Sequence, residues 1–303
     1  MAASVVAAGA ALALLASAAP AAPLDRAGQT TSTGLAVPPS HTITDPFAPS
    51  RGRLPATLAL SGTPGKDLTL SLAHQLFWRL DGSSPLYTSL GDRGNPRSVQ
   101  VATCAAGRFL VIADRGDMPG SDINPFVAML PWPVGQTNPD QQAKWVWTKK
   151  DDPDLIGPFS AQLLGDGHVL IADRSSSRVI EVAPNLKSGH GGSIVWQYGV
   201  ARQLGLTPGH LIDPFAASKL TNGNVLICDN NGGNRVIEVK ASDYDPTKAD
   251  DGYTDASIVW QYGMAGAFGT GPGHLIMAHS AQRLANGDTL IADSDEKSDR
   301  VIE

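Results

Sequence analysis

Apolar residues occur in short runs of strand length between residues 206 and 263. Four runs follow one another, at 213–220, 224–229, 234–239 and 257–262. Asn222-Gly223 joins the first two runs, and Asn-Gly favours the positive φ angles of a tight hairpin turn. Residues 230–233 form a second loop, Asn-Asn-Gly-Gly, of residues that tolerate a left-handed backbone. The pattern predicts four antiparallel strands in one sheet, which needs further sheets to cover its faces.

The chain supplies further copies of this unit. Segments 157–173, 213–229 and 277–293 align without a gap, and each contains an Asp-Gly or Asn-Gly turn. The third strand recurs as Arg-Val-Ile-Glu from Arg178, Arg235 and Arg300, and the fourth as Ile-Val-Trp-Gln-Tyr-Gly from Ile194 and Ile258. Fainter copies occur at 109–148 and 58–91. Four strands per unit at a period of about 50 to 60 residues is typical of β-propeller blades.

The best-preserved copy begins Pro208-Gly-His-Leu-Ile-Asp-Pro-Phe and continues to Asn234-Arg-Val-Ile-Glu-Val. It closely resembles the NHL repeat of β-propellers. The Ile-Val-Trp-Gln-Tyr strand departs from that pattern and is similar to blades of bacterial arylsulfotransferases and quinoprotein-type propellers. The resemblance covers about residues 95–303. It implies a fold and no single activity, because such propellers include both binders and enzymes.

The predicted fold is therefore an all-β propeller of four-stranded antiparallel blades. We expect blades at about 58–94, 95–150, 151–200, 206–263 and, incompletely, 271–303. The sequence ends at Glu303 within a third strand, and an unfinished sheet exposes its edge. We therefore expect a fragment of a parent with six or more blades.

The N-terminal segment predicts export. Residues 1–23 are apolar and rich in small residues, with small-x-small sites that a signal peptidase would cleave. Alanine and two prolines make a stable membrane span a poor alternative. Residues 24–57 are rich in Ser, Thr and Pro and are expected to form a linker. The predicted location is secreted or periplasmic.

The charge argues against one class of partner, and the positions of the two cysteines argue against a disulfide. The 303 residues carry a formal charge of −6, without a run of Lys and Arg, which argues against nucleic acid as a partner. Cys104 and Cys228 fall in different blades, so no disulfide is expected. Cys228 replaces an alanine of the repeat and is interpreted as a small buried hydrophobe.

Several polar residues recur with the repeat and are interpreted as structural. Asp173, Asp229 and Asp293 end the second strands, where they would accept hydrogen bonds from turn N–H groups or pair with Arg178, Arg235 and Arg300. Glu181, Glu238 and Glu303 are expected on strand surfaces. Trp196 and Trp260 favour packing between blades over a quinone cofactor.

His279 breaks the repeat, because Phe159 and Phe215 occupy its position at the start of the innermost strand. Such a break can mark function, here as a general acid/base or metal ligand near a central channel, but no complete set of partner residues accompanies it, so a structural histidine is the favoured alternative. His210 and His274 share one loop position, and Asp213 departs from Gly157 and Met277. These three are binding candidates.

A metal site is a weaker hypothesis. Oxygen ligands for Ca²⁺ are present in the insertion at residues 241–256, as Asp243, Asp245, Asp250 and Asp251. Their spacing is not that of an EF-hand, so a solvated acidic loop is the alternative. No cofactor is implied with certainty, and a divalent metal stays open.

Three functions remain open from the sequence. The preferred one is an exported NHL-like propeller that binds a protein or carbohydrate ligand without chemistry. The second is an arylsulfotransferase-like or lyase-like enzyme that uses His279, and the third is a quinoprotein-type redox propeller.

Overall fold

The computed structural model describes residues 58–61, 69–72, 95–116, 124–132, 143–245, 247, 253–294 and 299–303. The chain divides into two compact units, Leu12–Arg79 and Leu80–Glu303 together with Met1–Ala11. In the smaller unit, β1 (Leu58–Ser61) and β2 (Thr69–Leu72) form an antiparallel hairpin. The predicted leader, the linker and the other strands expected before residue 95 lie outside the described residues. Over the described part of the chain, no helix has the length and apolar character that a membrane crossing requires.

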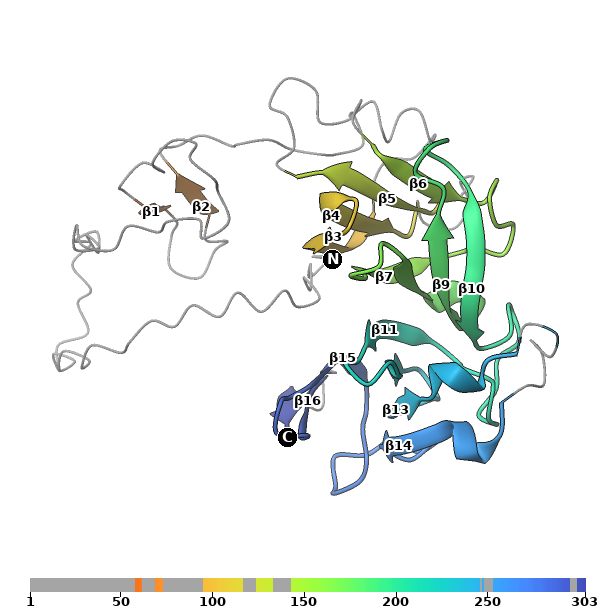
Figure 1. Cartoon of the computed structure of the whole chain (residues 1–303). Coiled ribbons are helices and arrows are strands. Elements are labelled where there is room, and N and C mark those ends of the chain that lie inside the picture. Colours follow the sequence, from red (N-terminus) through yellow and green to blue (C-terminus); the bar gives the residue numbers. More distant parts are fainter. Residues whose placement is uncertain are drawn as a thin grey trace, which may run out of the picture. The chain divides into compact units, whose positions relative to one another are not determined.

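The larger unit contains four antiparallel sheets that follow one another along the chain (Figure 1). In each sheet, strands adjacent in sequence are hydrogen-bonded neighbours, as in propeller blades. Three sheets are four-stranded and the last is three-stranded. Their strands are β3 (Pro96–Cys104), β4 (Gly107–Asp114), β5 (Phe126–Pro131) and β6 (Trp145–Thr148); β7 (Pro158–Leu163), β8 (Val169–Asp173), β9 (Arg178–Pro184) and β10 (Gly192–Tyr198); β11 (Pro214–Lys219), β12 (Val225–Asp229), β13 (Arg235–Val239) and β14 (Ile258–Tyr262); and β15 (Ala278–Arg283), β16 (Thr289–Asp293) and β17 (Arg300–Ile302). The predicted all-β propeller architecture is confirmed.

The hairpin between β11 and β12 differs from the predicted two-residue turn. Leu220 donates its N–H to Asn224 O at 2.8 Å, and Gly223 donates to Leu220 O at 3.0 Å, which makes a three-residue loop. Gly223 has a φ of 86°, and Asn222 is not among the residues with positive φ. Asn222 instead uses its side-chain Oδ1 to accept the N–H of Asn224 at 2.9 Å. Glycine therefore supplies the left-handed residue and asparagine supplies the side-chain acceptor.

The first strand of each sheet packs against the first strand of the next, in the order β3, β7, β11 and β15. Ser98 Oγ accepts the N–H of Ala161 at 3.1 Å, and Gln100 Oε1 accepts the N–H of Leu163 at 2.8 Å. The side chains of β3 thus extend hydrogen bonding from one sheet to the next.

The same Ser-x-Gln pattern joins β7 to β11. Ser160 Oγ accepts the N–H of Ala217 at 3.2 Å, and Gln162 Oε1 accepts that of Lys219 at 2.8 Å. In β11 the corresponding residues are Ala216 and Ser218, and the described residues show no such bond from β11 to β15. An open groove separates these two strands, with Ser218 and Gln282 in its lining.

Apolar side chains fill the space between neighbouring sheets. One buried cluster joins Val111 and Trp145 of the first sheet to Ile171 of the second, and another joins Trp196 of the second to Ile227 of the third. Lys219 Nζ lies 5.8 Å from the Trp196 ring, and the equivalent Arg283 lies 4.7 Å from Trp260. The tryptophans therefore pack between blades, as predicted from their periodicity.

Both cysteines are free and buried, in agreement with the predicted absence of a disulfide. Cys228 lies in the apolar cluster between the third and fourth sheets. Burial, with a smaller contribution from Asp229, raises the pKa of the Cys228 thiol to about 12. The thiol is thus protonated and unreactive at neutral pH, as expected of a small core residue.

Candidate functional site

A buried carboxylate at the end of each second strand fixes the start of the innermost strand of the same sheet. Asp229 Oδ1 accepts the N–H groups of Ile212 and Asp213 at 2.8 and 2.9 Å. Arg235 Nε lies 3.2 Å from the other oxygen of Asp229. Asp173 with Arg178, and Asp293 with Arg300, make the same two kinds of contact. Both contacts proposed from the sequence are present together.

Directly after this fixed point, each innermost strand has a β-bulge. In the third sheet Pro214 pairs with Asp229 and Ala216 with Cys228, so Phe215 is the extra residue. The same register shift occurs in the other sheets and makes Arg97, Phe159 and His279 the equivalent residues. Bulges change the direction of a side chain, and they are common beside active sites. Each blade therefore has one bulged residue at the same position, near the start of its innermost strand.

These side chains meet, together with two arginines that follow the buried carboxylates. The Phe159 and Phe215 ring centroids are 4.9 Å apart, and His279 lies 5.0 Å from Phe215 in an edge-on arrangement. The guanidinium of Arg174 lies 4.5 Å from the centre of the Phe159 ring and 4.3 Å from that of Phe215. Those of Arg97 and Arg115 lie 4.9 and 5.8 Å from Phe159. We call these six residues the inner-strand cluster: Arg97, Arg115, Phe159, Arg174, Phe215 and His279.

The positive charges of the cluster are only partly compensated. Arg174 Nε forms an ion pair with Asp213, which also accepts a hydrogen bond from Asn231. Burial and then the neighbouring Arg115 and Arg174 lower the pKa of Arg97, against the opposing effect of Asp114. Burial and Arg174 likewise lower the pKa of Arg115, against Asp213. Both arginines remain protonated at neutral pH, and the described residues give neither an ion pair.

The predicted candidate His279 lies at the edge of this cluster, on β15. Burial is the main cause of its lowered pKa, and the positive charge of Arg174 acts in the same direction. A hydrogen bond to the backbone of Ser294 and the charge of Asp293 oppose the shift. The imidazole is therefore neutral at pH 7, which is the form of a general base or metal ligand.

The structure separates the other predicted binding residues. Asp213 reaches the cluster through Arg174. His210 and His274 instead lie in the loops before β11 and β15, where their backbone oxygens accept hydrogen bonds from Arg235 and Arg300 at 3.1 and 2.7 Å. The glycine before each histidine donates its N–H to a tyrosine hydroxyl, Tyr198 or Tyr262. The geometry of the two histidines is that of loop-anchoring residues.

The acidic insertion is described only in part. Asp243, at the end of η3 (Ala241–Asp243), accepts a hydrogen bond from Ser242, and Asp245 accepts two from Thr247. Asp250 and Asp251 lie outside the described residues. The Ca²⁺ hypothesis for this loop stays a prediction.

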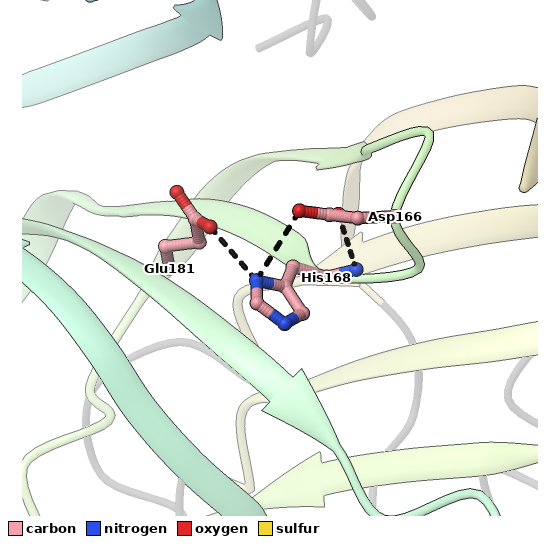
Figure 2. Close-up of side chains that lie close together, drawn as sticks. All are labelled: Asp166, His168 and Glu181. Carbon is pink, nitrogen blue, oxygen red and sulfur yellow. Dashed lines mark hydrogen bonds and ion pairs between the residues drawn. The ribbon is translucent and has the colours of Figure 1, made fainter. Parts of the chain in front are cut away.

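A second candidate metal site, made of two carboxylates and a histidine, lies where β8 and β9 meet the turn between β7 and β8. Figure 2 shows the His168 ring between the carboxylates of Glu181 and Asp166. His168 Nδ1 is 2.9 Å from Glu181 and 3.6 Å from Asp166. These three side chains have the residue types and spacing of a metal-ligand group. The second oxygen of Glu181, however, already binds Lys219 Nζ of β11 at 3.0 Å.

The repeat favours a structural interpretation of this group. In the next blade Glu238 accepts hydrogen bonds from Asn222 and Asn224 and pairs with Arg283 of β15 at 2.8 Å. The contacts are equivalent, although the histidine has been replaced by an amide. Both glutamates are buried, so the prediction that they lie on strand surfaces was wrong. They connect a turn of one blade to a basic residue of the next.

Comparisons with known proteins add no family. No protein-family model and no curated protein matches the chain. Among solved structures, a protein of unknown function from Bacteroides caccae is 16% identical with a TM-score of 0.35, and the match covers 69% of this chain and 73% of that one. A periplasmic gluconolactonase from Pseudomonas aeruginosa is 15% identical with a TM-score of 0.39. That match covers 69% of this chain but only 53% of the gluconolactonase, about half its length.

Proposed function

We propose that this chain is exported and binds a ligand at the inner-strand cluster of an NHL-like β-propeller. The observation that carries the proposal is the convergence of one bulged residue from each of four sheets, Arg97, Phe159, Phe215 and His279. Buried Asp–Arg pairs hold the positions of Phe159, Phe215 and His279, while the residue at the bulge is Arg in the first blade, Phe in the next two and His in the fourth. Constant support beneath variable side chains is typical of a binding site on a repeat scaffold.

A panel of soluble compounds tests this function by their effect on the melting temperature. The panel contains neutral sugars, uronic acids, carboxylates and phosphates, and the proteins are the wild-type chain, Phe215→Leu and His279→Phe. We expect at least one compound to raise the melting temperature of the wild type and to lose most of that effect in Phe215→Leu. Arg202→Gln, which changes an exposed arginine outside the cluster, is the control. If every stabilising compound acts equally on all four proteins, the cluster is not the binding site.

A catalytic role for His279 is the second candidate. Its neutral imidazole can accept a proton, and the nearby Arg174 can stabilise developing negative charge. The compounds that bind are therefore incubated with the wild type and His279→Phe, and products are measured. Turnover lost in His279→Phe while binding persists would replace the binding function by an enzymatic one.

A further inference from the structure

Two cations of the inner-strand cluster lie close together, and neither forms an ion pair with the described residues. Arg97 belongs to β3 and Arg115 follows β4, and both guanidinium groups lie beside the ring of Phe159. Asp213 is already engaged by Arg174 and Asn231, and Asp114 binds the backbone N–H groups of Asn95 and Gly116. Three arginines, Arg97, Arg115 and Arg174, thus face the two carboxylates of Asp114 and Asp213, which leaves an excess of about one positive charge.

Polar groups around the same level also lack partners. Arg97 Nε and both side-chain polar atoms of Asn230 are buried without a hydrogen-bond partner among the described residues. Asn230 occupies in the third blade the position that Arg115 and Arg174 occupy in the first two. A buried donor without an acceptor is costly, so the unpartnered N–H of Arg97 favours an acceptor that arrives from outside.

The positive charge and the shape of the donors select the ligand. Guanidinium groups match the oxygens of phosphate or carboxylate groups through two parallel N–H bonds. Two guanidinium groups beside one aromatic ring can share a single compact anionic group. A phosphate group is anionic at neutral pH and, unlike a carboxylate, has enough oxygens to accept two bonds from each of two guanidinium groups.

We propose that Arg97 and Arg115 together bind the dianionic phosphate group of a phosphate monoester, beside the rings of Phe159 and Phe215. The proposal rests on the proposed function, because it assigns a ligand class to the same cluster. Arg174, paired with Asp213, positions the two aromatic rings.

Calorimetric titration with inorganic phosphate, at low ionic strength and pH 7.5, tests this assignment. We expect phosphate to bind at least about ten times more tightly than acetate, and Arg97→Gln and Arg115→Gln each to weaken phosphate binding by about ten-fold or more. Arg97→Lys and Arg115→Lys keep the charge but lose the two-bond geometry, so their loss should be smaller. Arg202→Gln, with the same change in net charge, should bind like the wild type.

The melting temperature without phosphate separates a binding role from a structural one. Removal of one of two like charges relieves repulsion, so Arg115→Gln should be at least as stable as the wild type in phosphate-free buffer. Absence of phosphate binding, or equal binding by the wild type and the Arg97→Gln/Arg115→Gln double variant, would overturn the proposal.

The two proposals can fail separately. If a neutral compound binds in a manner that depends on Phe215 but not on Arg97 or Arg115, the binding function stands and the phosphate assignment is wrong. If no compound depends on any residue of the cluster, both are wrong.

Discussion

Asp173 differs from its repeat partners because two carboxylates share its arginine. Arg178 Nη2 contacts Asp152 and lies 3.4 Å from Asp173, and all three side chains are buried. Burial raises the pKa of Asp173 to about 6, although Arg178 and the N–H groups of Gly157 and Ile156 act in the opposite direction. The additional carboxylate of Asp152 contributes to the increase.

This shift predicts a pH dependence of stability. A carboxyl group whose pKa is higher in the folded state binds its proton more tightly there. The protonated Asp173 carboxyl group therefore contributes to the free energy of unfolding below pH 4, and this contribution is lost as pH rises through about 6. Relative to Asp173→Asn, the free energy of unfolding of the wild type should decrease with pH in this window, by at most about 1.4 kcal/mol per pH unit. Urea denaturation of both proteins from pH 4 to 7.5 measures the difference, and parallel curves would contradict it.

Among the elements, the innermost strands differ in how they are joined. β3 and β7 each place Ser and Gln side chains on the backbone of the next inner strand, whereas β11 has Ala216 and Ser218 at these positions. The loss of two hydrogen bonds coincides with the open groove between β11 and β15. The contact between the third and fourth sheets is therefore weaker than the contacts that join the first sheet to the second and the second to the third.

Restoring the pattern in β11 should strengthen this connection. The double substitution Ala216→Ser with Ser218→Gln supplies acceptors for the N–H groups of Ala281 and Arg283, the positions equivalent to Ala217 and Lys219. At about 1 kcal/mol for each hydrogen bond, the free energy of unfolding should increase by about 2 kcal/mol. Chemical denaturation gives the value, and Ser160→Ala with Gln162→Ala in β7 should have the opposite effect. No change in either double variant would mean that these bonds do not stabilise the blade contacts.

At the scale of the whole molecule, stability should decrease towards the fourth sheet. Every residue of β8 and β12 is buried, whereas buried and partly exposed residues alternate in the equivalent strand β16. Hydrogen–deuterium exchange should therefore be faster for the amides of β15–β17 than for those of β7–β10, because sparse packing permits local opening. Equal protection in both sheets would instead indicate a single cooperative unit.

The net charge of the whole molecule is negative, but positive charge gathers at one place. The sequence has a formal charge of −6 and no basic run, yet three arginines from two blades meet at the inner-strand cluster. A net charge is an average over the surface, and it does not exclude a local positive site.

The sequence by itself determined the strands and hairpin order of the second to fourth blades and the repeating Asp–Arg pairs, because these depend on residues close together in the chain or on a period visible in the sequence. It also singled out His279, since a histidine in a phenylalanine position breaks that period. The sequence did not predict the three-residue loop between β11 and β12, because Asn222 acts through its side chain and not through a positive φ.

Only the tertiary structure shows that Arg97, Arg115 and Arg174 lie around one aromatic ring, that of Phe159. The first blade is a faint copy of the repeat, so no pattern in the sequence indicates that Arg97 occupies the position of Phe159 and His279. Likewise, Glu181 and Glu238 look like surface residues within their own strands, and the basic residue that buries each one comes from the next blade. Contacts between blades join residues about 40 to 60 positions apart, at distances where local patterns of hydrophobicity and turn chemistry carry no information.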